Sequence, residues 1–279
     1  MTPAFPPFGI VVPIRNEAAT LRETLPALVQ SIGQLPARPV WVCNECSDDS
    51  AEVIREFAGQ DAEILILPHA GKSTALQAGD DALERLFPRF YLDADVKLSP
   101  GALPALLHLL LSGQADLVAA RRSHETSGVT ALSAAMARTW DALPYAQEMG
   151  FLGAIGVSSA GRACWGRWPI VMGDDLFVTA SIAPDRRQIV THVTGTTRPP
   201  ADFVGWVRMR ARWRQGEAEL RAMGLIAAKP PGQRRALLRQ MVTPRLALGA
   251  WAFAAARLLA PLVHTTPASG WQPDRRTFR

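Results

Sequence analysis

Short apolar runs alternate with helical segments through the first hundred residues, and this order constrains the fold more than any other feature of the chain. Residues 9–13, 39–43 and 63–67 are short apolar runs of the kind that form buried strands. Between the first two runs, residues 18–32 place leucine and isoleucine at helical spacing, and Gly33 follows as a stop signal. Alternating strands and helices predict an α/β fold in which helices cover both faces of a mixed, mostly parallel sheet.

Polar side chains follow the predicted strands. Asp93 and Asp95 come directly after the apolar run 90–92, and polar clusters at residues 15–17 and 44–45 follow the first and second strands. Ligands of such sheets bind beyond the carboxyl ends of the strands, so we expect these clusters to share one edge. Carboxylates two residues apart on an extended chain point the same way, and they repel each other unless a cation lies between them. A divalent cation would accept such oxygen ligands, and the alternative is a pair of solvated turn aspartates.

The second half of the chain is less regular. Residues 188–192 are predicted to form a short strand and residues 203–223 a long helix, whereas residues 121–160 are compatible with either a mobile loop or a helix. A proline-rich break then precedes a stretch that is both basic and apolar. We therefore predict an α/β domain that carries the polar clusters at residues 1–223 and a helical C-terminal extension at residues 224–279.

Charge is distributed unevenly along the 279 residues. Residues 198–279 hold 15 Lys and Arg against 4 Asp and Glu, the preceding chain holds 15 against 21, and together they give the net charge of +5. An acidic body with a basic tail suggests an anionic partner for the tail, either a diphosphate, an anionic membrane face or nucleic acid. The arginines lack the aromatic interleaving of a single-strand binding platform, so we expect no nucleic acid partner.

Cysteine usage and the absence of apolar leaders bear on localisation. Cys43, Cys46 and Cys164 are an odd number and form no disulfide framework, which favours a reducing compartment. The first eight residues lack the regions of a signal peptide, and no uninterrupted apolar run reaches the roughly 20 residues of a spanning helix. We expect a cytoplasmic protein, either free or peripheral on the inner membrane face.

Six short motifs occur in order along the chain: residues 10–17 (IVVPIRNE), 42–49 (VCNECSDD), 71–79 (GKSTALQAG), 92–95 (LDAD), 173–176 (GDDL) and 212–216 (RWRQG). Together they resemble the motifs of the family 2 glycosyltransferases, which are inverting enzymes with the GT-A nucleotide-sugar fold. Asn44-Glu45 replaces the usual acid pair of this family, and Met209 stands where Gln is usual, which speaks against a processive polysaccharide synthase.

The resemblance implies a donor sugar on UDP or GDP, a divalent metal (Mg²⁺ or Mn²⁺), and an acceptor that is a small molecule, a carbohydrate or a lipid-linked compound. It implies that Asp95 holds the metal and that Asp93 contacts the donor's ribose or belongs to the metal shell, with His192 as a third metal ligand. A core or surface histidine is the alternative for His192. The positions implied to contact the nucleotide sugar or the acceptor are Pro13, Arg15, Asn16, Glu17, Asn44, Glu45, Lys72, Asp93, Ala94, Asp95, Arg212 and Trp213.

The resemblance also assigns the catalytic pair. Asp175 would be the general base that takes the proton of the acceptor hydroxyl, and Asp174 would raise its basicity by like-charge repulsion. The alternative for both aspartates is a helix N-terminus. For Arg212 and Trp213, the alternatives are an exposed arginine and a core tryptophan.

Other readings remain open at this point. The C-terminal extension is either a helix on an anionic membrane face, near a lipid-linked acceptor, or an ordinary helix packed on the domain or on a dimer partner. The alternative functions are a nucleotide-sugar-binding protein without transfer activity and a nucleotidyltransferase. The second would need a glycine-rich loop after the first strand, where the chain has Pro13 to Glu17 and no glycine.

Overall fold

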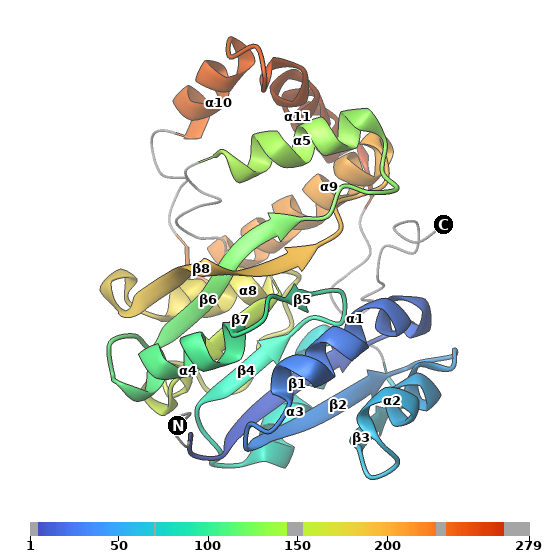
Figure 1. Ribbon diagram of the computed structural model, residues 1–279. Helices are drawn as coiled ribbons and strands as arrows, with labels where there is room; N and C mark the ends of the chain where they lie inside the picture. The colour runs from blue at the N-terminus through green and yellow to red at the C-terminus, as the bar shows by residue number, and fades with distance from the viewer. Residues whose placement is uncertain (1–4, 70, 144–152, 227–232, 265–279) are drawn as a thin grey trace.

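The computed structural model describes residues 5–69, 71–143, 153–226 and 233–264, and its centre is one eight-stranded sheet (Figure 1). β1 pairs in parallel with β2 and β4, β2 with β3, and β6 with β8, whereas β7 is antiparallel to both of its neighbours and β5 is antiparallel to β8. The predicted mixed, mostly parallel sheet is therefore confirmed. From one edge to the other the strands are β3 (Glu63–Leu67), β2 (Ala37–Asn44), β1 (Phe8–Ile14), β4 (Arg89–Leu92), β7 (Ala154–Val157), β6 (Leu117–His124), β8 (Arg187–Thr197) and β5 (Lys97–Leu98).

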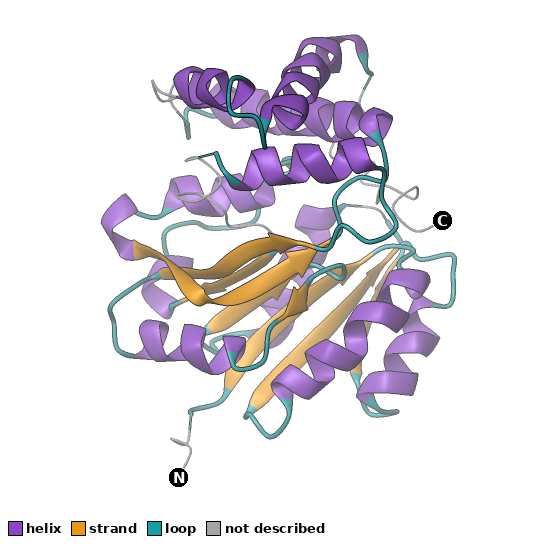
Figure 2. Ribbon diagram, turned by 45° about the horizontal axis from the view of Figure 1, so that its top comes forward, coloured by secondary structure: helices purple, strands orange, loops and turns teal. Residues whose placement is uncertain are grey.

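Helices cover both faces of the sheet, as Figure 2 shows. Because side chains alternate along a strand, Ile10 and Val12 of β1 enter one apolar cluster and Val11 enters another. The first cluster is covered by α1 (Ala18–Ile32), α2 (Ser50–Ala58) and α4 (Ala102–Leu111). The second is covered by α3 (Lys72–Leu83) and α8 (Asp174–Ser181).

A third apolar cluster joins three helices that lie beside the sheet. These are α5 (Ala131–Asp141), α9 (Phe203–Ala222) and α11 (Ala247–Leu259), and they meet through Met136, Trp206 and Phe253 among others. A side chain on Gly249 of α11 would place its Cβ 2.1 Å from the carbonyl oxygen of Ala135, so α11 packs directly on the backbone of α5. The inner face of the C-terminal extension is thus packed on the rest of the chain.

The remaining elements are short or lie at the C-terminal end. α10 (Gln233–Met241) and α11 lie at the top of Figure 1, above α5 and α9. Among the described residues, no helix combines the length and apolar character needed to cross a bilayer. The predicted boundary between residues 223 and 224 falls just after α9 and stays a prediction. The other short elements are α7 (Ser159–Arg162), η1 (Pro184–Arg186) and η2 (Ala260–Leu262).

The structure resolves what the sequence left open between residues 121 and 160. This segment holds the end of β6, the helix α5 and the strand β7, while residues 144–152 lie outside the described part of the chain. The predicted strand at residues 188–192 is longer, because β8 runs from Arg187 to Thr197 with a bulge. The two-residue strand β5 was not predicted, since so short a run carries no periodicity.

Candidate functional site

The predicted polar clusters do meet at one edge of the sheet. β1, β2 and β4 run in parallel, so the residues that follow them emerge on the same side. Asn44 ends β2, Glu17 precedes α1, and Asp93 follows β4 directly. The N-termini of α3 and α8 reach this edge from the chain's first and second halves, and Lys72 and Asp174 are their first residues.

Lys72 links two of the predicted aspartates. Its Nζ lies 2.8 Å from Oδ1 of Asp93 and 3.0 Å from Oδ2 of Asp174, and the Lys72 side chain is only 17% exposed. Burial opposes the charge on Lys72, but Asp174 and Asp93 outweigh it and hold the pKa of this lysine above its usual value. One ammonium group therefore ties the end of β4 to the start of α8.

Burial and neighbouring charges raise the pKa of three acidic side chains around Lys72. Burial, followed by the charge of Asp174, raises the pKa of Asp175 to about 7, and burial also raises the pKa of Asp174. Burial, followed by the charge of Asp93, raises the pKa of Asp95 to about 6. These shifts arise because Asp93, Asp95, Asp174 and Asp175 share one small region that holds a single lysine between two of them.

Glu17 belongs to the same cluster. Burial is the largest cause that raises its pKa to about 7, and the charges of Asp95 and Asp93 raise it further, against a lowering hydrogen bond from Thr20. Glu17 occupies the N-cap position of α1, but it makes no side-chain capping bond there. Its carboxyl group instead lies close enough to Asp93 and Asp95 for their charges to raise its pKa.

The start of α8 is fixed by a close backbone approach to α9. The N-cap residue is Gly173, so Asp174 and Asp175 lie in the first turn, and Oδ1 of Asp175 accepts a hydrogen bond from the backbone N–H of Leu176 at 2.7 Å. A Cβ on Gly216 of α9 would lie 2.9 Å from the backbone nitrogen of Gly173. This packing positions both aspartates. The glycine inside a long helix was the sequence signal for it.

The loop that carries Asp93 and Asp95 is anchored from two sides. The backbone N–H of Asp93 donates to the carbonyl of Gly153 at 2.6 Å, and the hydroxyl of Thr24 donates to the carbonyl of Ala94 at 2.6 Å. Ala94 thus contributes its backbone to positioning. Thr24 and Gly153 were missed from the sequence, because both bonds join segments far apart in the chain.

The loops after β1 and β2 are joined to each other. Arg15 forms an ion pair with Glu45, and Oδ1 of Asn16 accepts from the backbone N–H of Ser47 at 2.7 Å. Asn16 and Glu45 both have positive φ values, 52° and 54°, which non-glycine residues rarely adopt. The Nε and Nη1 atoms of Arg15 are buried and lack a hydrogen-bond partner within the described residues.

Asn44 and Pro13 lie behind these loops. Asn44 is fully buried, and its Nδ2 donates to the carbonyl of Gly71 at 2.8 Å, which fixes the residue before α3 and hence Lys72. Its Oδ1 is buried without a partner among the described residues. Pro13 is a buried residue of β1 opposite Val42. Asn44 therefore positions the start of α3, and Pro13 is part of the buried strand β1 that leads to the site.

The structure separates Arg212 from Trp213. Arg212 lies close enough to Asp95 for its charge to lower the pKa of that carboxyl group. Trp213 packs instead on Trp140, with ring centroids 4.5 Å apart, in the cluster that joins α5, α9 and α11. Of the two alternatives for Trp213, this packing is the one expected of a core tryptophan.

The structure does not group His192 with the aspartates as metal ligands. It is exposed, in the bulge of β8 between Val190 and Thr194. The described part of the chain holds no group of three or more His, Cys, Asp or Glu side chains arranged to bind a metal ion, so His192 does not complete a three-ligand set with Asp93 and Asp95. The predicted short strand at residues 188–192 missed the bulge of β8 in which His192 lies.

The residues present fit a divalent cation. Asp93 and Asp95 offer the hard oxygen ligands that Mg²⁺ and Mn²⁺ prefer, and two carboxylates are enough for an ion that keeps waters and binds substrate phosphates. Burial, followed by the charge of Asp93, raises the pKa of Asp95 more than the charges of Lys72 and Arg212 lower it. A cation at this pair would therefore relieve a repulsion that the protein leaves in place.

Comparison with known proteins identifies the family and the fold. A sequence model described as Glycosyl transferase family 2 matches residues 9–167, which is more than half of the chain. No curated protein matches the sequence. Solved structures with the same fold include several glycosyltransferases.

Three of these structures illustrate the likeness. The mannosyltransferase PcManGT from Pyrobaculum calidifontis, in complex with GDP-Man and Mn²⁺, is 19% identical with a TM-score of 0.55, covering 94% of this chain and 77% of that one. Glucosyl-3-phosphoglycerate synthase from Mycobacterium tuberculosis, with Mn²⁺, UDP-glucose and phosphoglyceric acid, is 19% identical with a TM-score of 0.53, covering 79% and 81%. Mannosyl-3-phosphoglycerate synthase from Rubrobacter xylanophilus is 17% identical with a TM-score of 0.53, covering 82% and 78%.

Proposed function

Because the chain belongs to glycosyl transferase family 2 and has the GT-A-like α/β fold, we propose that it transfers a sugar from a UDP- or GDP-linked donor to an acceptor hydroxyl, with inversion and with a divalent cation. The observation that carries this proposal is the convergence of Asp93, Asp95, Asp174 and Asp175 around Lys72. Two of these residues are suited to hold a cation, and one is suited to accept a proton.

The donor would lie across the carboxyl ends of β1, β2 and β4. Asp93 and Asp95 would hold the cation, which would supply Lewis acidity to the departing diphosphate. Lys72 and Arg212 add positive charge on the same side, since both lower the pKa of Asp95. The joined loops with Arg15 and Glu45 would contact the nucleoside, and the two unpartnered nitrogens of Arg15 are donors that a ligand would satisfy.

Asp175 is the proposed general base. Direct displacement at the anomeric carbon needs a carboxylate beside the attacking hydroxyl, and that hydroxyl transfers its proton to the carboxylate as the new bond forms. Burial and Asp174 raise the pKa of Asp175 to about 7, which is the range where a base accepts a proton most effectively at neutral pH. The bond from Leu176 holds one oxygen of Asp175 in place.

Two classes of acceptor are candidates for testing. Glucosyl-3-phosphoglycerate synthase is seen with phosphoglyceric acid, so small phosphorylated acids are one class, and lipid-linked acceptors are another. The family match favours sugar transfer over nucleotidyl transfer. Binding of a nucleotide sugar without transfer is the alternative function, and the following experiment must distinguish it from sugar transfer. A cytoplasmic location remains a prediction.

A thermal-shift panel tests the donor part of the proposal. We expect UDP or GDP to raise the melting temperature only when Mn²⁺ or Mg²⁺ is present, because the diphosphate needs the cation at Asp93 and Asp95. The matched control is Asp95→Asn, which should remove the metal-dependent shift. No shift with any nucleoside diphosphate would contradict the proposal. A shift without sugar release in a donor-hydrolysis or transfer assay would leave the binding-only alternative.

A further inference from the structure

The C-terminal helices present an apolar face to solvent. Leu248, Trp251, Leu258 and Leu262 are 66%, 62%, 78% and 76% exposed, and we call them the apolar stripe. Their spacing of three, seven and four residues places them on one side of α11 and η2. The opposite side of α11, with Gly249 and Phe253, is already buried on α5 and α9. An apolar stripe of this size on a surface marks a site of contact with another apolar body.

The same helices carry only positive charge. Residues 233–262 contain five arginines and no aspartate or glutamate. On α10, exposed Arg235 and Arg239 flank Leu238, which is 60% exposed. A helix that combines exposed leucine and tryptophan with arginine, and that has no acidic residue, has the composition of a helix lying in the headgroup region of an anionic bilayer.

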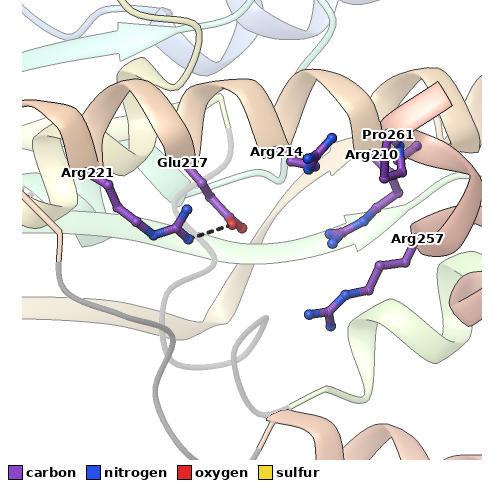
Figure 3. A pocket seen from close by; sticks show the side chains of 7 residues that line it. Arg210, Arg214, Glu217, Arg221, Arg257 and Pro261 are labelled. Atoms are coloured by element: carbon purple, nitrogen blue, oxygen red, sulfur yellow. Dashed lines mark hydrogen bonds and ion pairs between the residues drawn. The ribbon is translucent and has the colours of Figure 1, made fainter. Parts of the chain in front are cut away.

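A pocket lined by arginine lies next to the apolar stripe. It has a volume of about 260 Å³ between α9 and the end of α11, and it is lined by Arg210, Arg214, Arg221 and Arg257 with one acidic residue, Glu217. Figure 3 shows these side chains and the ion pair of Glu217 with Arg221, whose N–O distance is 3.0 Å. We call this site the arginine pocket. Its net charge favours a phosphate group.

Two of the four arginines are available for a ligand. Arg214 is exposed and Arg257 is half-buried, and neither makes an ion pair or a side-chain hydrogen bond with any other residue that the structure describes. Arg210 packs over the rings of Trp213 and Phe253, at 5.0 Å and 5.3 Å from their centroids. Arg210 therefore supports the pocket, and Arg214 and Arg257 are its open donors.

The arginine pocket is separate from the acidic site. Arg210, Arg214, Glu217 and Arg221 recur at intervals of four, three and four residues, so they share one face of α9. Arg212, which lies near Asp95, is two residues from Arg210 and hence about 200° around the helix. The two faces of α9 thus serve different sites, and a ligand of the pocket would not compete with the donor.

We propose that α10, α11 and η2 form a membrane-docking surface, in which the arginine pocket binds the phosphate of an anionic phospholipid and the apolar stripe enters the acyl boundary. Leu258 and Leu262 directly flank Arg257 and Pro261 of the pocket in the chain, so headgroup and acyl contacts fall side by side. The charge and the apolar exposure both point to this occupant. A second copy of the chain would use the apolar stripe but not the arginines, and a nucleic acid would use the arginines but not the apolar stripe.

Vesicle flotation of the full chain tests this proposal. We expect binding to vesicles of phosphatidylcholine mixed with phosphatidylglycerol, and weak binding to phosphatidylcholine alone. Arg214→Gln with Arg257→Gln should lower the partition coefficient roughly thirtyfold. Leu258→Ser with Leu262→Ser should lower it by at least roughly tenfold. The matched controls are Arg85→Gln and Leu111→Ser, two exposed positions on other elements, which should bind as the unmodified chain does.

Several outcomes would overturn the proposal. Equal binding to neutral and anionic vesicles, or an equal loss in the controls, would exclude the arginine pocket as the headgroup site. If vesicles do not bind, a thermal shift with inorganic phosphate that Arg214→Gln abolishes would assign the pocket to free phosphate. Dimerisation that Leu258→Ser dissolves, or binding of an oligonucleotide in place of vesicles, would assign the surface to another partner. Transfer to a water-soluble acceptor should be unchanged in all four variants.

Discussion

Two regions of this glycosyltransferase gather like charges, and they do so in opposite ways. At the acidic edge, Asp93, Asp95 and Asp174 are partly buried around Lys72, and their segments are held by the Thr24 hydroxyl of α1, by the Gly153 carbonyl just before β7 and by the close packing of α9. In the C-terminal layer formed by α10, α11 and η2, arginines and large apolar side chains lie at the surface, and residues 233–262 contain no aspartate or glutamate. Burial makes charge repulsion strong and geometry exact enough for chemistry, whereas exposure keeps repulsion weak and suits a broad, salt-sensitive contact.

The largest expected effect is on the acidic edge. Asp175→Asn should lower sugar transfer roughly a thousandfold, because the amide cannot accept the hydroxyl proton, while donor binding should stay within about twofold. Steady-state transfer and donor titration measure the two quantities. Asp185→Asn, an exposed aspartate after α8, is the matched control and should retain full activity. Full transfer by Asp175→Asn would remove this residue from the role of base.

Removing the shared lysine should affect both activity and stability. Lys72→Gln leaves Asp93 and Asp174 without their cation, so we expect transfer to fall roughly a hundredfold and the free energy of unfolding to fall by about 3 kcal/mol near pH 8. Urea unfolding measures the second quantity. Lys97→Gln breaks an ion pair with Glu125 that is about one-third exposed and should cost at most about 1 kcal/mol. If Lys72→Gln and Lys97→Gln lower the free energy of unfolding equally, the buried ion pairs of Lys72 contribute no more stability than the partly exposed pair of Lys97.

Two glycines allow the regions to be compared directly. Gly216→Ala would insert a Cβ between α9 and the start of α8, and Gly249→Ala would insert one between α11 and α5. Both should lower the free energy of unfolding by about 1–3 kcal/mol. Only Gly216→Ala should also lower transfer, by about tenfold, because it moves Asp174 and Asp175. If Gly249→Ala lowers transfer equally, the C-terminal layer would be part of the catalytic unit.

The smallest expected effect is the pH dependence of stability. The pKa values of Asp95, Asp175 and Glu17 are raised to about 6, 7 and 7 in the folded protein, above those of an unfolded chain. Their protonated forms therefore favour folding, and this contribution is present below about pH 4 and is lost as the pH rises through about 6 to 7. Because nearby carboxylates contribute to one another's raised pKa values, their contributions do not add, and we expect a loss of about 1–2 kcal/mol.

Chemical denaturation at pH 5 and pH 8 checks this sign. Asp175→Asn should flatten the dependence, and Mn²⁺ should reduce the loss at pH 8 because it binds the deprotonated carboxylates. The transfer rate should change in the opposite direction, rising as Asp175 deprotonates. A free energy of unfolding that rises between pH 5 and pH 8 would contradict the raised pKa values.

Local patterns predicted much of this structure. The bounds of α1 and β3 follow from apolar spacing and stop signals, and the order of strands and helices predicted the sheet. The aspartate pair and Lys72 were found because the residues that carry them form short contiguous motifs. Family resemblance, rather than spacing, supplied Asp174 and Asp175.

The rest depended on contacts between distant segments. Nothing local indicates that Thr24 would bond Ala94, or that Lys72 would bridge two aspartates 81 residues apart. Trp213 was expected beside a sugar, but the ring of Trp140 from α5 lies against it. His192 was expected on a short strand, and the bulge of β8 leaves it exposed.

The bridge at Lys72 has a consequence for the order of events in a catalytic cycle. The ammonium group lowers the pKa of Asp175 while Asp174 raises it. A diphosphate that engages Lys72 would neutralise the charge of this lysine, so that it no longer lowers the pKa of Asp175, while Asp174 would still raise that pKa. Proton acceptance by Asp175 would then strengthen only after the sugar nucleotide has arrived, and an acceptor that binds alone would meet a weaker base.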